Sequence, residues 1–194
     1  MLWAAHHAGL ELRTEGGETR LSGRFPYGRE TILREAGNGG PELREVFAPR
    51  AFGGSAKTLD RNIHLLAGHD FAKPLASFRA ETLQVEDTDE ALVIEARITP
   101  IMAGVTYVAD LLAAVRAGLT LGLSPGFRLQ SGPGAEVITR GGNAVLRTVH
   151  HALLEEISIV TRPAYPEAQV EARCWQPGGT TAVSRVVYHY QRWR

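Results

Sequence analysis

Residues 153–163 read Leu-Leu-Glu-Glu-Ile-Ser-Ile-Val-Thr-Arg-Pro, and the interpretation of the whole chain starts from them. The aliphatic and β-branched residues predict a β-strand that ends before the proline. Successive side chains of a strand face opposite sides, so only one of Glu155 and Glu156 should face inward. Glu156 shares a face with Ser158 and Val160, where a carboxylate could orient an imidazole. The alternative is a pair of solvated acids on an edge.

Strand signals continue on the N-terminal side of this stretch and outnumber helical ones. Residues 10–24 alternate loosely around Gly16-Gly17, which predicts a hairpin. Residues 131–142 form a Gly-rich segment, and residues 86–90 an acidic turn. Further strand-like runs occupy residues 63–67, 75–85, 91–98, 119–129 and 144–150. The chain is therefore expected to be rich in β-structure.

One principal helix is predicted at about residues 103–117. Apolar residues recur at helical spacing after Thr99, Pro100 is tolerated at a helix start, and Gly118 provides a stop. Residues 49–59 predict a second, shorter helix that contains two glycines.

Composition limits the class of protein. The 194 residues suit one domain, and 21 Lys plus Arg against 21 Asp plus Glu leave no broad field for nucleic acid or an anionic membrane. The single cysteine, Cys174, cannot form an internal disulfide, and neither a secretory signal nor a spanning apolar run is apparent. A cytosolic protein without nucleic-acid or membrane partners is expected.

Ser124 is the candidate nucleophile because glycines on both sides permit a sharp bend that presents its hydroxyl. A serine at a simple strand kink is the alternative. The stretch Gly122-Leu123-Ser124-Pro125-Gly126 also matches the G-x-S-x-G pattern of α/β-hydrolases. That class is disfavoured because Pro125 has no N–H to donate and the following residues look extended rather than helical.

His69 is the candidate general base, since it ends an apolar strand-like run next to Gly68 and Asp70. Six other histidines are candidates by residue type alone: His6, His7, His64, His150, His151 and His189. A zinc site built from His64 and His69, or from His150 and His151, is disfavoured because neither spacing puts two ligands on one helix face. No metal is expected.

Taken in order, these segments resemble the prohead maturation proteases of tailed bacteriophages, a family similar in fold and nucleophile chemistry to the herpesvirus assemblins. The resemblance covers about residues 12–173. The blocks that carry it are Leu21-Ser22-Gly23, Glu45-Val46-Phe47-Ala48-Pro49-Arg50-Ala51-Phe52, Ile63-His64-Leu65-Leu66-Ala67-Gly68-His69-Asp70, residues 119–127, Leu154-Glu155-Glu156-Ile157-Ser158-Ile159-Val160-Thr161-Arg162-Pro163-Ala164-Tyr165-Pro166 and residues 168–170.

The resemblance implies a catalytic role for three residues. Ser124 takes the family's serine position, His69 its histidine position and Glu156 its acidic position, with Glu155 as the alternative third member. Arg50 departs from the pattern, because the family commonly has glycine there. Gly68 departs too, since a polar residue often precedes the His-Asp pair.

By the same resemblance, the expected protein is a serine endopeptidase of α+β class with a mostly antiparallel, barrel-like sheet. Its substrates would be the scaffold region of a major capsid protein or a separate scaffold, and the protease itself, inside an immature capsid in the bacterial cytoplasm. A homodimer is expected by analogy with the assemblins. No cofactor is expected. The alternative function is a non-enzymatic capsid-assembly or scaffold module with the same fold.

Two further expectations concern the bounds of the domain and the groups that would bind an oxyanion. Residues 1–176 are predicted to form the protease domain and residues 177–194 a basic, aromatic tail, because no carboxylate side chain follows Pro177-Gly178-Gly179. Since Pro125 cannot donate a hydrogen bond, the backbone of Arg140-Gly141-Gly142 is the candidate for stabilising an oxyanion.

Overall fold

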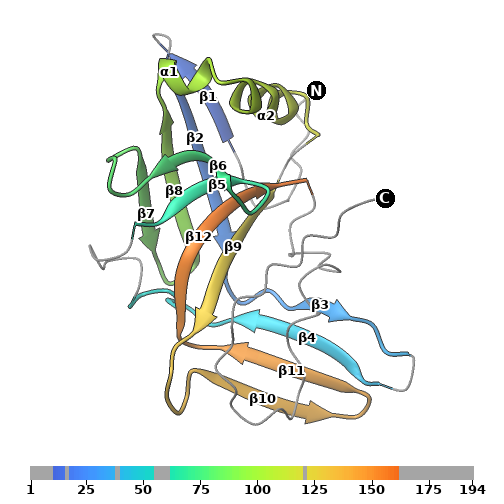
Figure 1. Cartoon of the computed structure of the whole chain (residues 1–194). Helices are drawn as coiled ribbons and strands as arrows, with labels where there is room; N and C mark the ends of the chain where they lie inside the picture. The colour runs from blue at the N-terminus through green and yellow to red at the C-terminus, as the bar shows by residue number, and fades with distance from the viewer. Residues whose placement is uncertain (1–10, 16–17, 38–39, 55–61, 120–121, 162–194) are drawn as a thin grey trace.

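The computed structural model describes residues 11–15, 18–37, 40–54, 62–119 and 122–161, and most of these residues belong to β-strands (Figure 1). Two helices interrupt the series between β8 and β9. In chain order the elements are β1 (Glu11–Glu15), β2 (Glu18–Pro26), β3 (Thr31–Arg34), β4 (Glu42–Phe47), β5 (His64–Ala67), β6 (Asp70–Ser77), β7 (Leu83–Asp87), β8 (Ala91–Ile98), α1 (Pro100–Ala103), α2 (Thr106–Arg116), β9 (Gly122–Leu129), β10 (Glu136–Gly141), β11 (Ala144–Val149) and β12 (Ala152–Val160).

Within the described residues the strands form three four-stranded sheets, in the orders β1-β2-β8-β7, β10-β11-β4-β3 and β6-β5-β12-β9. Neighbours are antiparallel except for two parallel pairs, β4 with β11 and β5 with β12. Two helices beside mainly antiparallel sheets agree with the predicted α+β class. The barrel-like sheet is not confirmed, because each of these sheets keeps two edge strands and no ladder between described strands closes a barrel.

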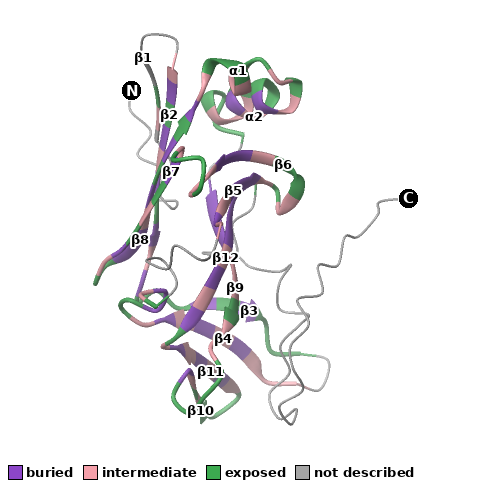
Figure 2. Ribbon diagram, turned by 60° about the vertical axis from the view of Figure 1, so that its left-hand side comes forward, coloured by how far each residue is buried: buried purple, intermediate pink, exposed green. Residues whose placement is uncertain are grey.

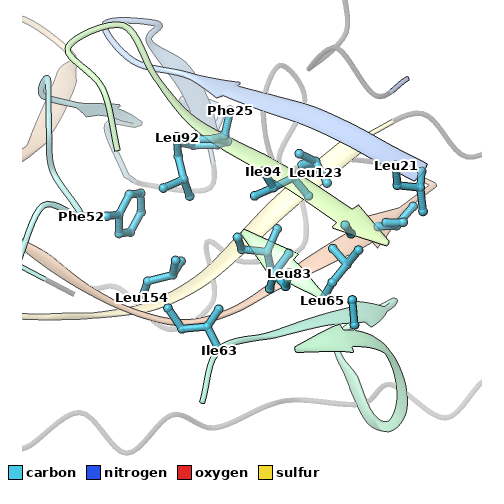
Figure 3. Close-up of a cluster of buried hydrophobic side chains, with 14 of the residues drawn as sticks. Leu21, Phe25, Phe52, Ile63, Leu65, Leu83, Leu92, Ile94, Leu123 and Leu154 are labelled. Atoms are coloured by element: carbon cyan, nitrogen blue, oxygen red, sulfur yellow. The ribbon is translucent and has the colours of Figure 1, made fainter. Parts of the chain in front are cut away.

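The main core lies between the first and third sheets (Figure 3). Leu21 of β2 and Ile94 of β8 come from the first sheet, and Leu65 of β5 and Leu123 of β9 from the third. All four side chains are buried. The two sheets lie opposite each other in Figure 2, and one face of each packs into this core, which explains the alternating burial along β2 and β8.

An aromatic cluster joins all three sheets. The ring of Phe47, on β4, lies 5.3 Å from Phe25 of β2 and 5.0 Å from Phe127 of β9, edge to face in both cases. Phe52 stacks on Phe47 at 5.3 Å. Edge-to-face aromatic pairs add to the stability that burial alone provides, so this cluster holds the second sheet against the other two.

The predicted helix exists but is divided. α1 ends at Gly104, and extended Val105 precedes α2, whose buried residues are Val108 and Leu112. The Thr99 hydroxyl accepts a hydrogen bond from Met102 N and caps α1. The helices lie at the end of the molecule opposite β10 and β11 (Figure 1). No helix in the described part of the chain is long and apolar enough to cross a membrane.

Other local predictions had mixed outcomes. The N-terminal hairpin is confirmed as β1 paired with β2. The run at 75–85 is instead two strands, β6 and β7, separated by a turn, and the Gly-rich segment contains β10. The helix predicted at 49–59 is wrong over residues 49–54, which form turns, and its remainder lies outside the described residues, as does the tail at 177–194.

Arg50 has a positive φ of 55°, a conformation that favours glycine. The family that the sequence resembles commonly has glycine at this position, which suits such a conformation. The Arg50 side chain is exposed and forms an ion pair with Asp89, Nε to Oδ1 at 2.5 Å. An exposed ion pair contributes little, so the backbone conformation should dominate the effect of substitution.

Arg50→Gly is expected to be more stable than Arg50→Ala by about 1 kcal/mol. Both variants lose the guanidinium, so their difference isolates the cost of a side chain at positive φ. Denaturant unfolding of the two proteins measures it. Equal stabilities would mean that residue 50 does not adopt this backbone conformation.

A buried pair links the ends of β2 and β7. Burial raises the pKa of the Tyr27 hydroxyl, which therefore stays protonated and donates to Oδ1 of Asp87. Burial also raises the pKa of Asp87, and this effect outweighs the hydrogen bond from Tyr27 and the charge of Arg50, which both lower it. The native state consequently holds the Asp87 proton more tightly than the unfolded chain does.

Stability should therefore fall with rising pH in a way that depends on Asp87. Its contribution is complete below the unfolded pKa of about 4 and is lost as pH rises through the raised native pKa. Asp87→Asn removes this titration. We expect the free energy of unfolding of the wild type, relative to Asp87→Asn, to decrease as pH rises above about 4 in urea unfolding. A constant difference would contradict the prediction.

Candidate active site

Strand β12 separates the hydrophobic core from the candidate site. Ile157 and Ile159 face the core, whereas Glu156 and Ser158 face the other side of the sheet. Leu154 also faces the core, although simple alternation would put it on the same side as Glu156. A β-bulge between Leu154 and Glu156 shifts the register and resolves this conflict. The bulge is therefore what turns Glu156 away from the core.

The carboxylate of Glu156 is completely buried and hydrogen-bonded at both oxygens. Oε1 lies 2.7 Å from Nδ1 of His69, and Oε2 accepts from Oγ of Ser158 at 2.6 Å. Gly126, directly opposite on β9, makes room for it, because a Cβ at Gly126 would lie 2.2 Å from Oε1. Buried charge is tolerated only with such partners.

His69 lies in the tight turn between β5 and β6. Gly68 and His69 both have positive φ, 63° and 61°, and the strand pairing resumes between Ala67 and Asp70. Gly68 N donates to the Ile159 carbonyl at 3.0 Å, so the turn is attached to β12 as well as to its own strands. A histidine at positive φ is uncommon and marks a functional candidate.

The contact with Glu156 selects one tautomer of His69. A carboxylate oxygen accepts, so Nδ1 carries the proton and Nε2 carries the lone pair. This is the form of imidazole that can take a proton from a serine hydroxyl.

Ser124 lies inside β9 with only 3% of its surface exposed, directly opposite Ser158 of β12. Opposed residues of an antiparallel pair share a face, with Cβ atoms about 4.5–5.5 Å apart. The structure therefore joins His69 and Glu156 directly and brings Ser124 beside them through strand register. Because β9 continues through Pro125 to Leu129, the strand-to-helix turn of an α/β-hydrolase is not formed here.

Glu155 and Glu156 have different surroundings. Oε1 of Glu155 accepts from Nε of Arg128 at 2.7 Å, an interaction near the surface, whereas Glu156 contacts His69. The bulge leaves Glu155 without a register partner on β9, whereas Glu156 is paired with Gly126. Of the two, Glu156 has the geometry to orient His69.

The loop suggested as an oxyanion donor lies elsewhere. Arg140, Gly141 and Gly142 form the tip of the β10–β11 hairpin in the second sheet, well away from the β5–β6 turn and the start of β9 (Figure 1). The sequence could not show this, since it depends on how the sheets are arranged. Of the other described histidines, His64 lies next to Glu156, because the two residues are paired across β5 and β12, and Nε2 of its ring contacts Asn62. His150 and His151 follow β11 in the second sheet. No cluster of three or more His, Cys, Asp or Glu that could hold a metal occurs among the described residues.

Two residues of the site were not singled out from the sequence. Ser158 was noted only as a neighbour of Glu156 on its face, and Gly126 only as part of a bend. A signal existed for Gly126, because the residue opposite a buried carboxylate must be small, but it required knowing the pairing of β9 with β12.

The chain matches one family in comparisons with known proteins. A family model described as "Caudovirus prohead serine protease" matches residues 28–179, which include every residue of the site. No curated protein and no solved structure was found to match.

Gly126→Ala should displace the Glu156 carboxylate and so release His69 from its orientation. We expect acylation of Ser124 by a fluorophosphonate to slow by at least about 100-fold, because a triad histidine without its carboxylate partner loses about 10⁴ in rate. Overpacking should also lower stability by about 1–3 kcal/mol. Gly141→Ala is the matched control, since its added Cβ meets no atom within 4 Å. Equal labelling of the two variants would contradict the prediction.

Proposed function

The chain belongs to the caudovirus prohead serine protease family, and on this basis we propose that it is a serine endopeptidase. Ser124 is the nucleophile, His69 the general base and Glu156 the residue that orients His69. The description of the family as serine proteases supports this class of hydrolase. The assignment of roles rests on the geometry of the three side chains.

The observation that carries the proposal is the contact between His69 and a fully buried carboxylate. The 2.7 Å distance from Nδ1 to Oε1 selects the tautomer with a basic Nε2, and Ser124 lies on the same face of the sheet, opposite Ser158. This geometry supports a catalytic triad, in which a base is itself oriented by a third group.

The chemistry is acyl transfer in two stages. Nε2 of His69 removes the Ser124 proton as Oγ attacks the peptide carbonyl, and the resulting imidazolium protonates the leaving amine. Water, deprotonated by His69, then attacks the acyl-enzyme, and the acid product leaves with Ser124 regenerated. Glu156 stabilises the imidazolium without taking its proton. Pro125 contributes no N–H, so the oxyanion must be bound by donors other than the residue after Ser124.

The family implies substrates among the proteins of the immature capsid. We assign these as the scaffold region of the major capsid protein, or a separate scaffold, together with the protease itself. The site of action is then the prohead in the host cytoplasm, with a homodimer as the active form and residues 177–194 as a segment to be removed or to direct packaging. No nucleic acid, membrane or cofactor takes part in this proposal.

Ser124→Ala tests the function. Wild type and variant are each co-expressed with the capsid-protein substrate, and both chains are followed by intact-mass spectrometry and fluorophosphonate labelling. We expect discrete cleavage and labelling at Ser124 in the wild type and a loss of at least about 10³-fold in the variant.

Ser131→Ala is the matched control, because Ser131 is exposed in the loop after β9. It should cleave and label as the wild type does. Uncleaved substrate and no labelling in the wild type would instead favour a non-enzymatic assembly module. Loss of activity on adding a chelator, with Ser124→Ala still active, would favour a metal-dependent hydrolase.

A further inference from the structure

Ser158 forms hydrogen bonds with both His69 and Glu156. It lies on β12, two residues after Glu156, and has no exposed surface. Its Oγ donates to Oε2 of Glu156 at 2.6 Å and accepts from the backbone N–H of His69 at 2.9 Å. The hydroxyl therefore connects the backbone of the histidine to the carboxylate that binds the ring of the same histidine.

The direction of these bonds follows from the donors available. The backbone N–H of His69 can only donate, so Oγ of Ser158 accepts from it. The carboxylate of Glu156 accepts, so the single hydroxyl hydrogen points to Oε2. With the Nδ1–H bond to Oε1, the three interactions form a closed ring that starts and ends at His69. Both paths run from donors on His69 to the carboxylate of Glu156, and along the longer path the bond that Ser158 Oγ accepts polarises the bond that it donates.

The ring of hydrogen bonds includes a residue whose backbone is strained. His69 has a φ of 61°, which is costly for a residue with a side chain. The bond to Ser158 stabilises the N–H of this residue, and the bond from Gly68 to Ile159 holds the preceding one. Loss of the Ser158 hydroxyl would let the turn relax and would leave Oε2 without its donor in a buried place.

Simple space-filling does not explain a serine here. The side chain faces away from the core side of β12, and an alanine or valine would remove the donor to the buried Oε2 of Glu156 and the acceptor of the part-buried N–H of His69. Resting on the proposed function, we propose that Ser158 is a positioning residue of the site. It holds Glu156 and the His69 turn in the one relative geometry in which Nδ1 meets Oε1.

Four variants test this assignment. Ser158→Ala removes the hydroxyl, and Ser158→Thr retains it. Ser158→Val has the shape of the threonine variant without its hydroxyl, so the comparison of Thr with Val isolates the hydrogen bonds from the added methyl. Ser158→Cys, with a weaker donor of similar size, replaces the alanine variant if that protein does not fold.

The first measurement is the fluorophosphonate reaction of Ser124, resolved into reversible binding and acylation rate. We expect the acylation rate of Ser158→Val to be about 10- to 100-fold below that of Ser158→Thr, with binding unchanged, since two hydrogen bonds to charged or strained groups are lost. Equal acylation rates for these two variants would overturn the proposal. So would a defect that appears only in binding.

The second measurement does not depend on activity. The low-field proton resonance of His69 Nδ1–H should be present in the wild type and in Ser158→Thr, and absent or exchange-broadened in Ser158→Ala and Ser158→Val. Ser124→Ala serves as a background that retains the ring and lacks the nucleophile. If the wild type neither labels nor cleaves, the proposed function fails while this resonance still tests Ser158. An unchanged resonance in all variants would refute the positioning role.

Discussion

A carboxylate with no exposed surface needs a partner at each oxygen, and Glu156 imposes this requirement on the surrounding sheet. His69 and Ser158 supply the two donors, and Gly126 supplies the space. These residues come from β9, β12 and the turn after β5, so one charged group fixes three segments of the sheet relative to one another. Buried charge pairs add little net stability, yet breaking one is costly. The burial of Glu156 thus determines the relative positions of these three segments more than it adds to the free energy of unfolding.

The bulge in β12 allows nearby residues of one strand to face both the hydrophobic core and the candidate site. On the core side Leu154 and Ile157 pack in the main hydrophobic cluster, while Glu156 between them faces the site. A regular strand could not do this, because its side chains alternate strictly. Packing of the core therefore bears directly on the site: a shift in β12 that alters the fit of Ile157 would also move Glu156.

Two residues at positive φ show different ways of holding an unfavourable backbone. His69 is held by hydrogen bonds to β12, in a buried network that also orients its ring. Arg50 is at the surface, paired with Asp89, and glycine would serve the same turn. The imidazole of His69 takes part in that network through Glu156, whereas the side chain at position 50 forms only an exposed ion pair.

Local patterns in the sequence determined much of the secondary structure. Strand-like runs of apolar residues predicted β8, β11 and β12, and apolar periodicity predicted α2, because both signals lie within a few consecutive residues. The sequence and its resemblance also supplied the residue types of the site and left Glu155 open beside Glu156. The tertiary structure alone decided the parallel pairing of β5 with β12, the separate sheets in place of a barrel, the bulge in β12 and the different partners of those two carboxylates. The contact between His69 and Glu156 joins residues 87 positions apart, and no local pattern carries information about such a pairing.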